Sequence, residues 1–459
     1  MTAATLSLLA LCGLGPGPGP DPDPTTLIAQ LGSARFVERE RATTELEEIG
    51  PEALPALRVA KDARDPEVRA RAEAIIGRIE LRRLTRPTLV RLDLRDRTLP
   101  EVVLDLRRQT GFHLRLEDDL DPAARDRRVT LRADAPVPFW EALDKLCAAA
   151  ELRRFDRKTR DETEPTIVLA DGEGLRPRPG ATDGPFHAAI LDRRRQPDQM
   201  ARNRPGGGML AQLRIQLVAE PGILLRRAGP WRVVEAVDDR QNTLPTPPDE
   251  LIELNQLPRA DRIDPTALGS FQGEVWLRLP NRGGAKLDRL RVATPLVAAA
   301  RRPDPLVVRL ADAAGKSFTV GETALRFNRV ETEPGSGVIE LLVRSPEPAF
   351  QLPDPNNLGG PGFRGGFRGR FPLELSDALQ LQIEVVDARG RPCPWEHEPQ
   401  SGPNGRFRMM RLRGFRIGED LVTIRVSPPE DSEPVEFRFY SLMEASTEPT
   451  FEFDNITLP

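Results

Sequence analysis

The segment from Leu89 to Ala170 constrains the fold more than any other part of this chain. Its apolar residues switch twice from the period of two of a half-buried strand to the three-to-four spacing of an amphipathic helix. The order strand, helix, strand, strand, helix, strand predicts that residues 86–172 form a small βαββαβ domain, with two helices on one face of a sheet. The residues expected in its core are Val90, Leu92, Leu94, Leu99, Val102, Val103, Leu106, Phe112, Leu114, Leu116, Val129, Leu131, Phe139, Trp140, Ala142, Leu143, Leu146 and Cys147.

The length of 459 residues is too great for one hydrophobic core, so several domains are expected. Hydrophobic residues at 39% and charged residues at 30% suffice for ordered domains, while 46 prolines and 36 glycines indicate many turns and linkers. The formal net charge is only −4, and both signs are spread along the chain. The composition therefore does not favour a nucleic-acid partner.

Residues 1–25 are expected to be a signal peptide followed by a Pro/Gly linker. The apolar run at residues 3–14 is too short to cross a bilayer and ends where the Pro/Gly spacer begins. Cleavage near Cys12 would place the protein outside the cytoplasm, in the periplasm or cell envelope. The LALC sequence ending at Cys12 also permits lipidation, although Leu11 is bulky where that signal has a small residue.

Residues 26–85 follow a helical period. The order GPEALPAL and then DPEVRARAEAIIGRI resembles a HEAT repeat, whose second helix commonly opens with Asp-Pro. The resemblance covers one or two repeats, whereas a solenoid needs about three to bury its faces, so it implies a cap or a partner-binding piece. The residues expected on the buried faces are Phe36, Ala42, Leu46, Ile49, Val68, Ala72, Ile75, Ile76 and Ile79.

The sequence VTLRADAPVPFWEALDKLCAAAELR, at residues 129–153, combines a strand, a loop, an aromatic pair and Glu-Ala-Leu. It resembles the short N-terminal domain of secretins and TonB-dependent receptors. The resemblance implies an adaptor of the bacterial envelope that docks onto other proteins. The sequence beyond it shows no pattern of a secretin or receptor barrel, so secretion and transport activities are not implied.

Helical periodicity is absent after about Gly172, and short alternating apolar runs predict antiparallel strands. We expect a β module at 173–258, an immunoglobulin-like β-sandwich at 259–350, a Gly/Arg/Phe-rich loop at 351–372 and a second sandwich at 373–459.

One turn recurs in this region. Asp238, Asp312 and Asp387 each follow an apolar strand, at separations of 74 residues (312 − 238) and 75 residues (387 − 312). The near-equal spacing suggests two or three related β-units. We expect each aspartate to cap backbone amides, with Gly or Gln three residues later at the turn.

Several segments resemble functional motifs but lack their context. Gly315–Ser317 (GKS) has no first glycine of a phosphate loop and precedes a strand, and Gly206–Met209 (GGGM) precedes a strand where a dinucleotide site needs a helix. Glu117–Asp121 lacks the ligand spacing of a calcium loop, which favours a solvated loop. Gly359–Phe371 could bind single-stranded nucleic acid, but its isolation in an acidic chain favours a linker.

Side chains able to do chemistry are scarce. The chain has three histidines, His113, His187 and His397, and they fall in different predicted elements. His397 lies between two glutamates but has no second histidine a helical turn away, so a metal site is not expected. Cys147 and Cys393 fall in different predicted domains, which argues against a disulfide framework. We therefore expect no catalytic, cofactor-binding or metal-binding residues.

These features together predict a non-catalytic binding or scaffolding protein of the bacterial cell envelope, acting through contacts with a protein partner or an envelope polymer. The domain mixture resembles large extracytoplasmic proteins of planctomycete-type bacteria. No nucleic-acid partner and no transmembrane segment after the leader are expected. Two alternatives stay open: a carbohydrate-active or other hydrolytic enzyme built on paired carboxylates of the β modules, and a cytoplasmic HEAT scaffold.

Overall fold

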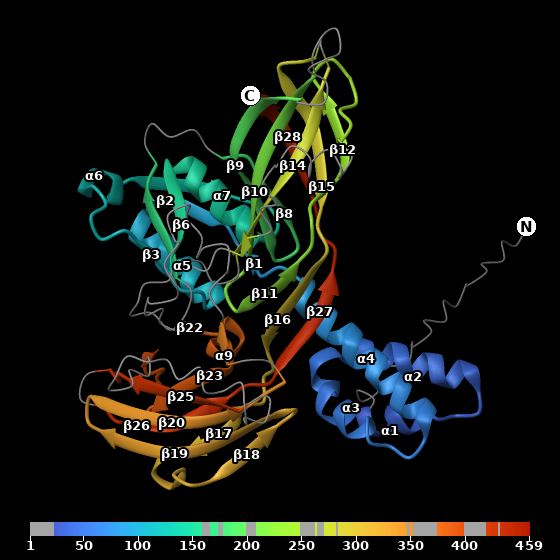
Figure 1. Cartoon of the computed structure of the whole chain (residues 1–459), viewed down its shortest axis with the longest axis vertical. Coiled ribbons are helices and arrows are strands. Elements are labelled where there is room, and N and C mark those ends of the chain that lie inside the picture. The colour runs from blue at the N-terminus through green and yellow to red at the C-terminus, as the bar shows by residue number, and fades with distance from the viewer. Residues whose placement is uncertain are drawn as a thin grey trace, which may run out of the picture. The chain divides into compact units, whose positions relative to one another are not determined.

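The structure is a computed structural model. It describes residues 23–157, 166–172, 178–198, 208–247, 262–263, 270–280, 283–346, 349–351, 374–398, 419–429 and 432–459. The described chain is mixed α+β and consists mostly of strands in antiparallel sheets, which confirms the predicted class (Figure 1). Residues 1–22 of the predicted leader and linker, with Cys12, and the segment Gly359–Phe371 lie outside the described residues. No helix among the described residues is long and apolar enough to cross a membrane.

The chain divides into two compact units, Met1–Arg83 and Leu84–Pro459. The first is helical, as predicted, and its elements are α1 (Pro24–Gln30), α2 (Phe36–Ile49), η1 (Gly50–Ala53), α3 (Leu54–Ala60) and α4 (Pro66–Thr85). The predicted buried stripe of α4 is confirmed, and Ala42 and Leu46 of α2 are fully buried. Phe36 was expected on the same face but is 63% exposed, because it is the first residue of α2 and lies beyond the buried stripe.

The second unit begins with the predicted α/β domain. Its elements are β1 (Leu89–Val90), β2 (Asp93–Thr98), α5 (Leu99–Thr110), β3 (Leu114–Leu116), α6 (Pro122–Arg125), β4 (Arg128–Arg132), β5 (Val137–Pro138), α7 (Phe139–Ala149), β6 (Leu152–Arg157) and β7 (Thr166–Asp171). Both predicted helices are present, and α5 begins at a Thr98/Glu101 capping box and ends at Gly111 with φ 72°. The strands form three small sheets, β1-β5, β2-β4 and β3-β7-β6, where one sheet was expected. The strand β6 was not predicted, because LRRFDR carries too few apolar residues to show a period of two.

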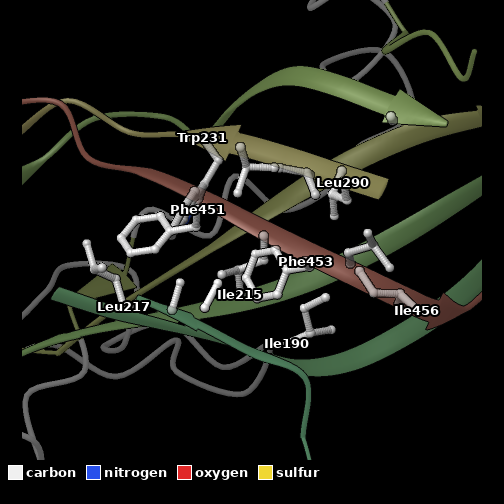
Figure 2. Packing of buried hydrophobic residues seen from close by; sticks show 14 of the residues in the cluster. Ile190, Ile215, Leu217, Trp231, Leu290, Phe451, Phe453 and Ile456 are labelled. Atoms are coloured by element: carbon white, nitrogen blue, oxygen red, sulfur yellow. The ribbon is translucent and has the colours of Figure 1, made fainter. Parts of the chain in front are cut away.

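Two antiparallel sheets enclose the next core. They have the orders β13-β14-β10-β9-β8 and β12-β15-β28. The bounds are β8 (Gly180–Asp183), β9 (Phe186–Pro197), β10 (Met209–Ala219), β12 (Arg232–Asp238), β13 (Arg262–Ile263), β14 (Ser270–Leu279), β15 (Lys286–Ala293) and β28 (Thr450–Thr457). Figure 2 shows Phe451 and Phe453 of β28 between side chains of the two sheets, with Trp231 next to Phe451. Residues 373–459 were expected as one module, but their last strand, β28, belongs to this core, whereas others of their strands belong to the C-terminal core.

The C-terminal core lies between sheets of the orders β17-β26-β23 and β18-β19-β20-β25-β24, and β21 pairs with β22 beside it. The bounds are β17 (Leu306–Arg309), η3 (Leu310–Asp312), β18 (Ser317–Val320), β19 (Thr323–Glu333), β20 (Ser336–Arg344), β21 (Phe350–Gln351), β22 (Glu374–Leu375), α9 (Asp377–Gln382), β23 (Ile383–Asp387), β24 (Trp395–His397), β25 (Glu419–Val426) and β26 (Pro434–Phe439). The run ALQLQIEVVDA was predicted as one strand, but its first half is α9, because the Ser376 hydroxyl caps the amide of Leu379.

A further sheet of order β11-β16-β27 continues the three-stranded sheet β12-β15-β28. It consists of β11 (Ile223–Ala228), β16 (Leu296–Arg301) and β27 (Leu442–Thr447). Each of its strands leads to or from a strand of that other sheet through a proline, at Pro230, Pro295 and Pro449. Proline has no amide hydrogen to donate, so each strand lacks one donor at this level, where Gly229 and Thr294 still donate to the carbonyls of Pro295 and Pro449.

The recurring aspartate turn has the expected geometry at two of its three positions. Asp238 and Asp387 are buried and each accepts hydrogen bonds from backbone amides of its own turn. Asp312 is exposed at the end of η3. The GKS sequence that follows forms the expected turn, in which Gly315 has φ 78°, and leads into β18.

Candidate functional site

His187 is the one histidine that the structure buries almost completely. It is the second residue of β9 and is 3% exposed. Its neighbours Phe186 and Ala188 point into the core between the two sheets, so alternation places His187 on the outward face of the five-stranded sheet. Val218, the residue paired with His187 on β10, packs into the core of the small α/β domain. His187 therefore lies at the junction between the sheet and that domain.

Two charged side chains of the α/β domain contact opposite nitrogens of the His187 ring. Nε2 lies 2.9 Å from Oδ2 of Asp144 on α7, and Nδ1 lies 3.4 Å from a guanidinium nitrogen of Arg154 on β6. Arginine can only donate, so Nδ1 must accept, and the proton of the neutral ring must lie on Nε2 and point to Asp144. Both ring nitrogens are thus engaged by the α/β domain.

The contact with His187 changes the pKa of the Asp144 carboxyl. Burial would raise the pKa of Asp144, but the hydrogen bond and the charge interaction with His187 lower it below its ordinary value. Gly180 on β8 permits the approach, because a Cβ atom there would lie 2.8 Å from Nε2 of His187 and 3.2 Å from Asp144. The lowered pKa favours the ionised form of Asp144, and a side chain at position 180 would collide with the His187–Asp144 pair.

Trp140 of α7 completes the junction. Its ring lies 5.6 Å from that of His187, and the guanidinium of Arg154 lies 4.5 Å from its centroid, within cation–π range. Its indole Nε1 donates to the carbonyl of Pro185 at 2.9 Å. Trp140 was predicted only as a core residue of the α/β domain, and its burial at 1% exposure confirms that prediction.

A second polar contact lies nearby. Glu220, just after β10, is 3% exposed and accepts hydrogen bonds from the backbone amide and the hydroxyl of Thr88, the hydroxyl at 2.6 Å. Burial raises the pKa of Glu220, and the Thr88 hydrogen bonds oppose that effect. Thr88 immediately precedes β1, so this contact fixes the start of the α/β domain to the end of β10.

The chemistry available at this junction is limited. The nearest thiol on α7 is Cys147, one turn after Asp144, and burial raises its pKa to about 12, so it is a thiol and not a thiolate near neutral pH. The His187 nitrogen that a general base would use is directed to Arg154. The arrangement Asp144–His187–Arg154 therefore joins α7 and β6 to the outward face of the five-stranded sheet.

The other sequence candidates lie apart from this junction. His113 is exposed just before β3, as expected for the polar face of a strand. His397 ends β24 in the C-terminal core, and burial lowers its pKa. Asp118, in the acidic Glu117–Asp121 segment, has a side chain that is 96% exposed. Among the described residues, no group of three His, Cys, Asp or Glu side chains is placed to hold a metal ion.

Sequence reasoning missed the His187 junction. The alternation of Phe186, Ala188 and Ile190 was a usable signal, because it places His187 on the face opposite the core. No local signal connects His187 to Asp144, which lies 43 residues earlier on a helix.

Comparisons with family models, with curated proteins and with solved structures find no match to this chain.

Proposed function

We propose that this protein is a non-catalytic binding or scaffolding protein of the bacterial cell envelope that acts through contacts with another protein. The observation that carries the proposal is the exposure of large apolar side chains on the helical unit. Phe36 is 63% exposed, Val37 76% and Val59 75%. A short helical piece cannot bury all its faces by itself, and exposed apolar side chains are the usual basis of protein contacts.

The junction around His187 supports the non-catalytic part of the proposal. There the titratable groups best placed for chemistry, Asp144 and His187, contact one another, and the thiol of Cys147 has a pKa of about 12. The rival proposal of a hydrolytic enzyme needs two carboxylates facing a common substrate. No described pair provides a specific reason to prefer it.

The finer assignments belong to the same proposal. We propose that residues 26–85 are a HEAT-like piece, because α3 and α4 follow the GPEALPAL and DPEVRARAEAIIGRI order of such repeats. The α/β domain is proposed to be an adaptor like the short domain of secretins and TonB-dependent receptors. The extracytoplasmic location rests on the leader sequence, and the immunoglobulin-like character of the two β cores rests on their paired antiparallel sheets.

The test is a quantitative crosslinking experiment with the full-length protein in its native envelope. Changing Phe36 and Val37 together to Asp should reduce capture of the partner about tenfold or more, because a few side chains buried at an interface carry most of its binding energy and a charge there would be left unpaired. The matched control is Val234→Asp, at an apolar side chain of β12 that is 50% exposed. Equal capture by both variants, or turnover of a glycan or ester substrate by the purified protein, would refute the proposal.

A further inference from the structure

The strand β18 is a free edge of the C-terminal core (Figure 1). It is the last strand of the five-stranded sheet, so among the described strands only β19 pairs with it. Ser317 and Thr319 are exposed, whereas Phe318 and Val320 pack partly against the core. An edge strand presents backbone donors and acceptors with which a further strand can pair. The exposed side of β18 therefore has the groups that another strand needs.

The hydrogen-bond phase of β18 shows which residues face that edge. The amide of Phe327 donates to the carbonyl of Lys316 at 3.0 Å, so Lys316 faces β19. In an antiparallel ladder, successive residues alternate between the two sides of the strand. Phe318 and Val320 therefore also bond to β19, and the amide and carbonyl of Thr319 point toward the free edge.

The sequence around β18 is complementary to itself in the antiparallel direction. The segment KSFTVGE is centred on Thr319. When two copies pair antiparallel about Thr319, each Lys316 lies opposite the partner's Glu322. Each Phe318 then lies opposite the partner's Val320. Opposite charges and aromatic residues next to β-branched residues are the favourable cross-strand pairs. This register also joins the Thr319 amide to the carbonyl of the partner's Thr319, as the phase of β18 requires.

The two charged residues are available for this pairing. Lys316 and Glu322 are both exposed, and neither takes part in an ion pair within the described part of the chain. Charged side chains, lysine above all, usually protect an edge strand from a second copy. Here a glutamate occupies the symmetric position, so the charges of two copies attract one another. The charge pattern therefore favours a second copy of this chain as the partner.

We propose that two copies of this protein associate through β18, which joins their five-stranded sheets edge to edge about a two-fold axis at Thr319. The same residues of both copies form the contact, as in any isologous dimer. A short strand pair buries less than the roughly 1,000 Å² of a stable interface, so the dimer is weak, with a dissociation constant on the order of 100 µM. The contact uses no residue of the helical unit, so it can be tested independently of the proposed function.

The experiment is analytical ultracentrifugation of the full-length protein over a range of concentrations, in which the wild type should form a reversible dimer. Thr319→Pro should abolish association, because proline removes the amide hydrogen at the centre of the contact. Proline is tolerated on an edge strand where the amide faces solvent, so the ladder with β19 is kept.

Ser446→Pro is the matched control on another edge strand. Ser446 is exposed on β27, the last strand of its sheet. Arg302 donates to the carbonyl of Ser441 in the ladder of β16 and β27, so alternation directs the Ser446 amide to the free edge. This variant should dimerise like the wild type.

Charge reversal gives a second test that does not depend on proline. Lys316→Glu and Glu322→Lys each place like charges opposite one another in the self-dimer, so each should weaken association about tenfold. An equal mixture of the two variants should associate as tightly as the wild type, because each variant then meets the opposite charge. A misfolded variant could not be rescued in this way.

Three results would overturn the proposal. The first is a wild-type protein that stays monomeric at about ten times the expected dissociation constant. The second is a Thr319→Pro variant that associates like the wild type, which would locate the self-association at another surface. The third is a mixture of Lys316→Glu and Glu322→Lys that associates no better than either variant alone.

Discussion

The carboxylates of Asp238 and Asp387 share three hydrogen bonds within their turns, in two different cores, and Asp238 accepts a further one from the amide of Gly284. In each turn, Oδ1 accepts from the amides two and four residues further along, at 2.9 and 2.8 Å for Asp238 and at 2.9 Å twice for Asp387. Oδ2 accepts from the side chain of the fourth residue, which is Asn242 in one turn and Arg391 in the other. The two turns are therefore structural equivalents, which supports the inference that the β-units are related.

The first prediction compares the three aspartates of the recurring turn. Asp238→Ala should lower the free energy of unfolding by about 2 kcal/mol, because it leaves buried amides without their acceptor. Asp387→Ala should act in the same direction on the C-terminal core. Asp312→Ala, the exposed control, should change stability by less than about 0.5 kcal/mol. Urea denaturation of the three variants provides the measurement, and equal effects at all three positions would contradict the structure.

The second prediction concerns acid stability. Burial would raise the pKa of Asp238, but hydrogen bonds from Asn242, Gly284 and Arg240 lower it to about 2. A carboxyl with a lowered pKa in the folded state stabilises the protein above its unfolded pKa, about 4, and loses that contribution as pH falls through the folded value. Asp238→Asn should therefore be less stable than the wild type at neutral pH, and the difference should shrink between about pH 4 and pH 2. A difference in unfolding free energy that stays constant over this range would refute the assignment.

The third prediction tests the packing of α7. Leu143 is fully buried in the core of the α/β domain, so Leu143→Ala should cost about 2–5 kcal/mol. Leu104 on α5 is 46% exposed and gives the control, for which Leu104→Ala should cost less than about 1 kcal/mol. Chemical denaturation of both variants is the measurement. A loss below about half a kcal/mol for Leu143→Ala would mean that the helix faces solvent.

The fourth prediction concerns the junction between the sheet and the α/β domain. His187→Ala removes the 2.9 Å contact with Asp144 from a buried site, so it should cost about 1–3 kcal/mol. Amide hydrogen exchange should also increase in β8 and in the start of β9. His113→Ala, at an exposed histidine, should leave stability and exchange unchanged. If His187→Ala exchanges like the wild type, the junction does not depend on this contact.

The fifth prediction concerns the thiols. Burial raises the pKa of Cys147 to about 12 and that of Cys393 to about 11, so little thiolate is present near neutral pH. Iodoacetamide should therefore label both residues slowly in the folded protein and rapidly in urea, as mass spectrometry of the two peptides would show. Rapid labelling of Cys147 in the folded protein would contradict the raised pKa and indicate a reactive thiol one helical turn from Asp144.

Local pattern was sufficient to predict much of the fold. The helices α5 and α7 and the strand β10 have strong, uninterrupted periods, and each was predicted because a repeating apolar face has only one regular structure that buries it. The run before β23 was predicted wrongly as strand, because five residues of alternating pattern also fit one and a half turns of helix. There the Ser376 hydroxyl caps the amide of Leu379 three residues later, a local signal for a helix start that the strand interpretation overlooked.

The sequence by itself determined the secondary-structure class, most core residues and the recurring aspartate turn, because these depend on neighbours within a few residues. Only the tertiary structure decided that β28 pairs with β15, that His187 meets Asp144 and Arg154, and that Glu274 faces Arg214. Each of these pairings joins residues from separate elements of the chain. Such contacts depend on the register and order of whole strands, and a local apolar period specifies which face of a strand is buried but not which strand lies beside it.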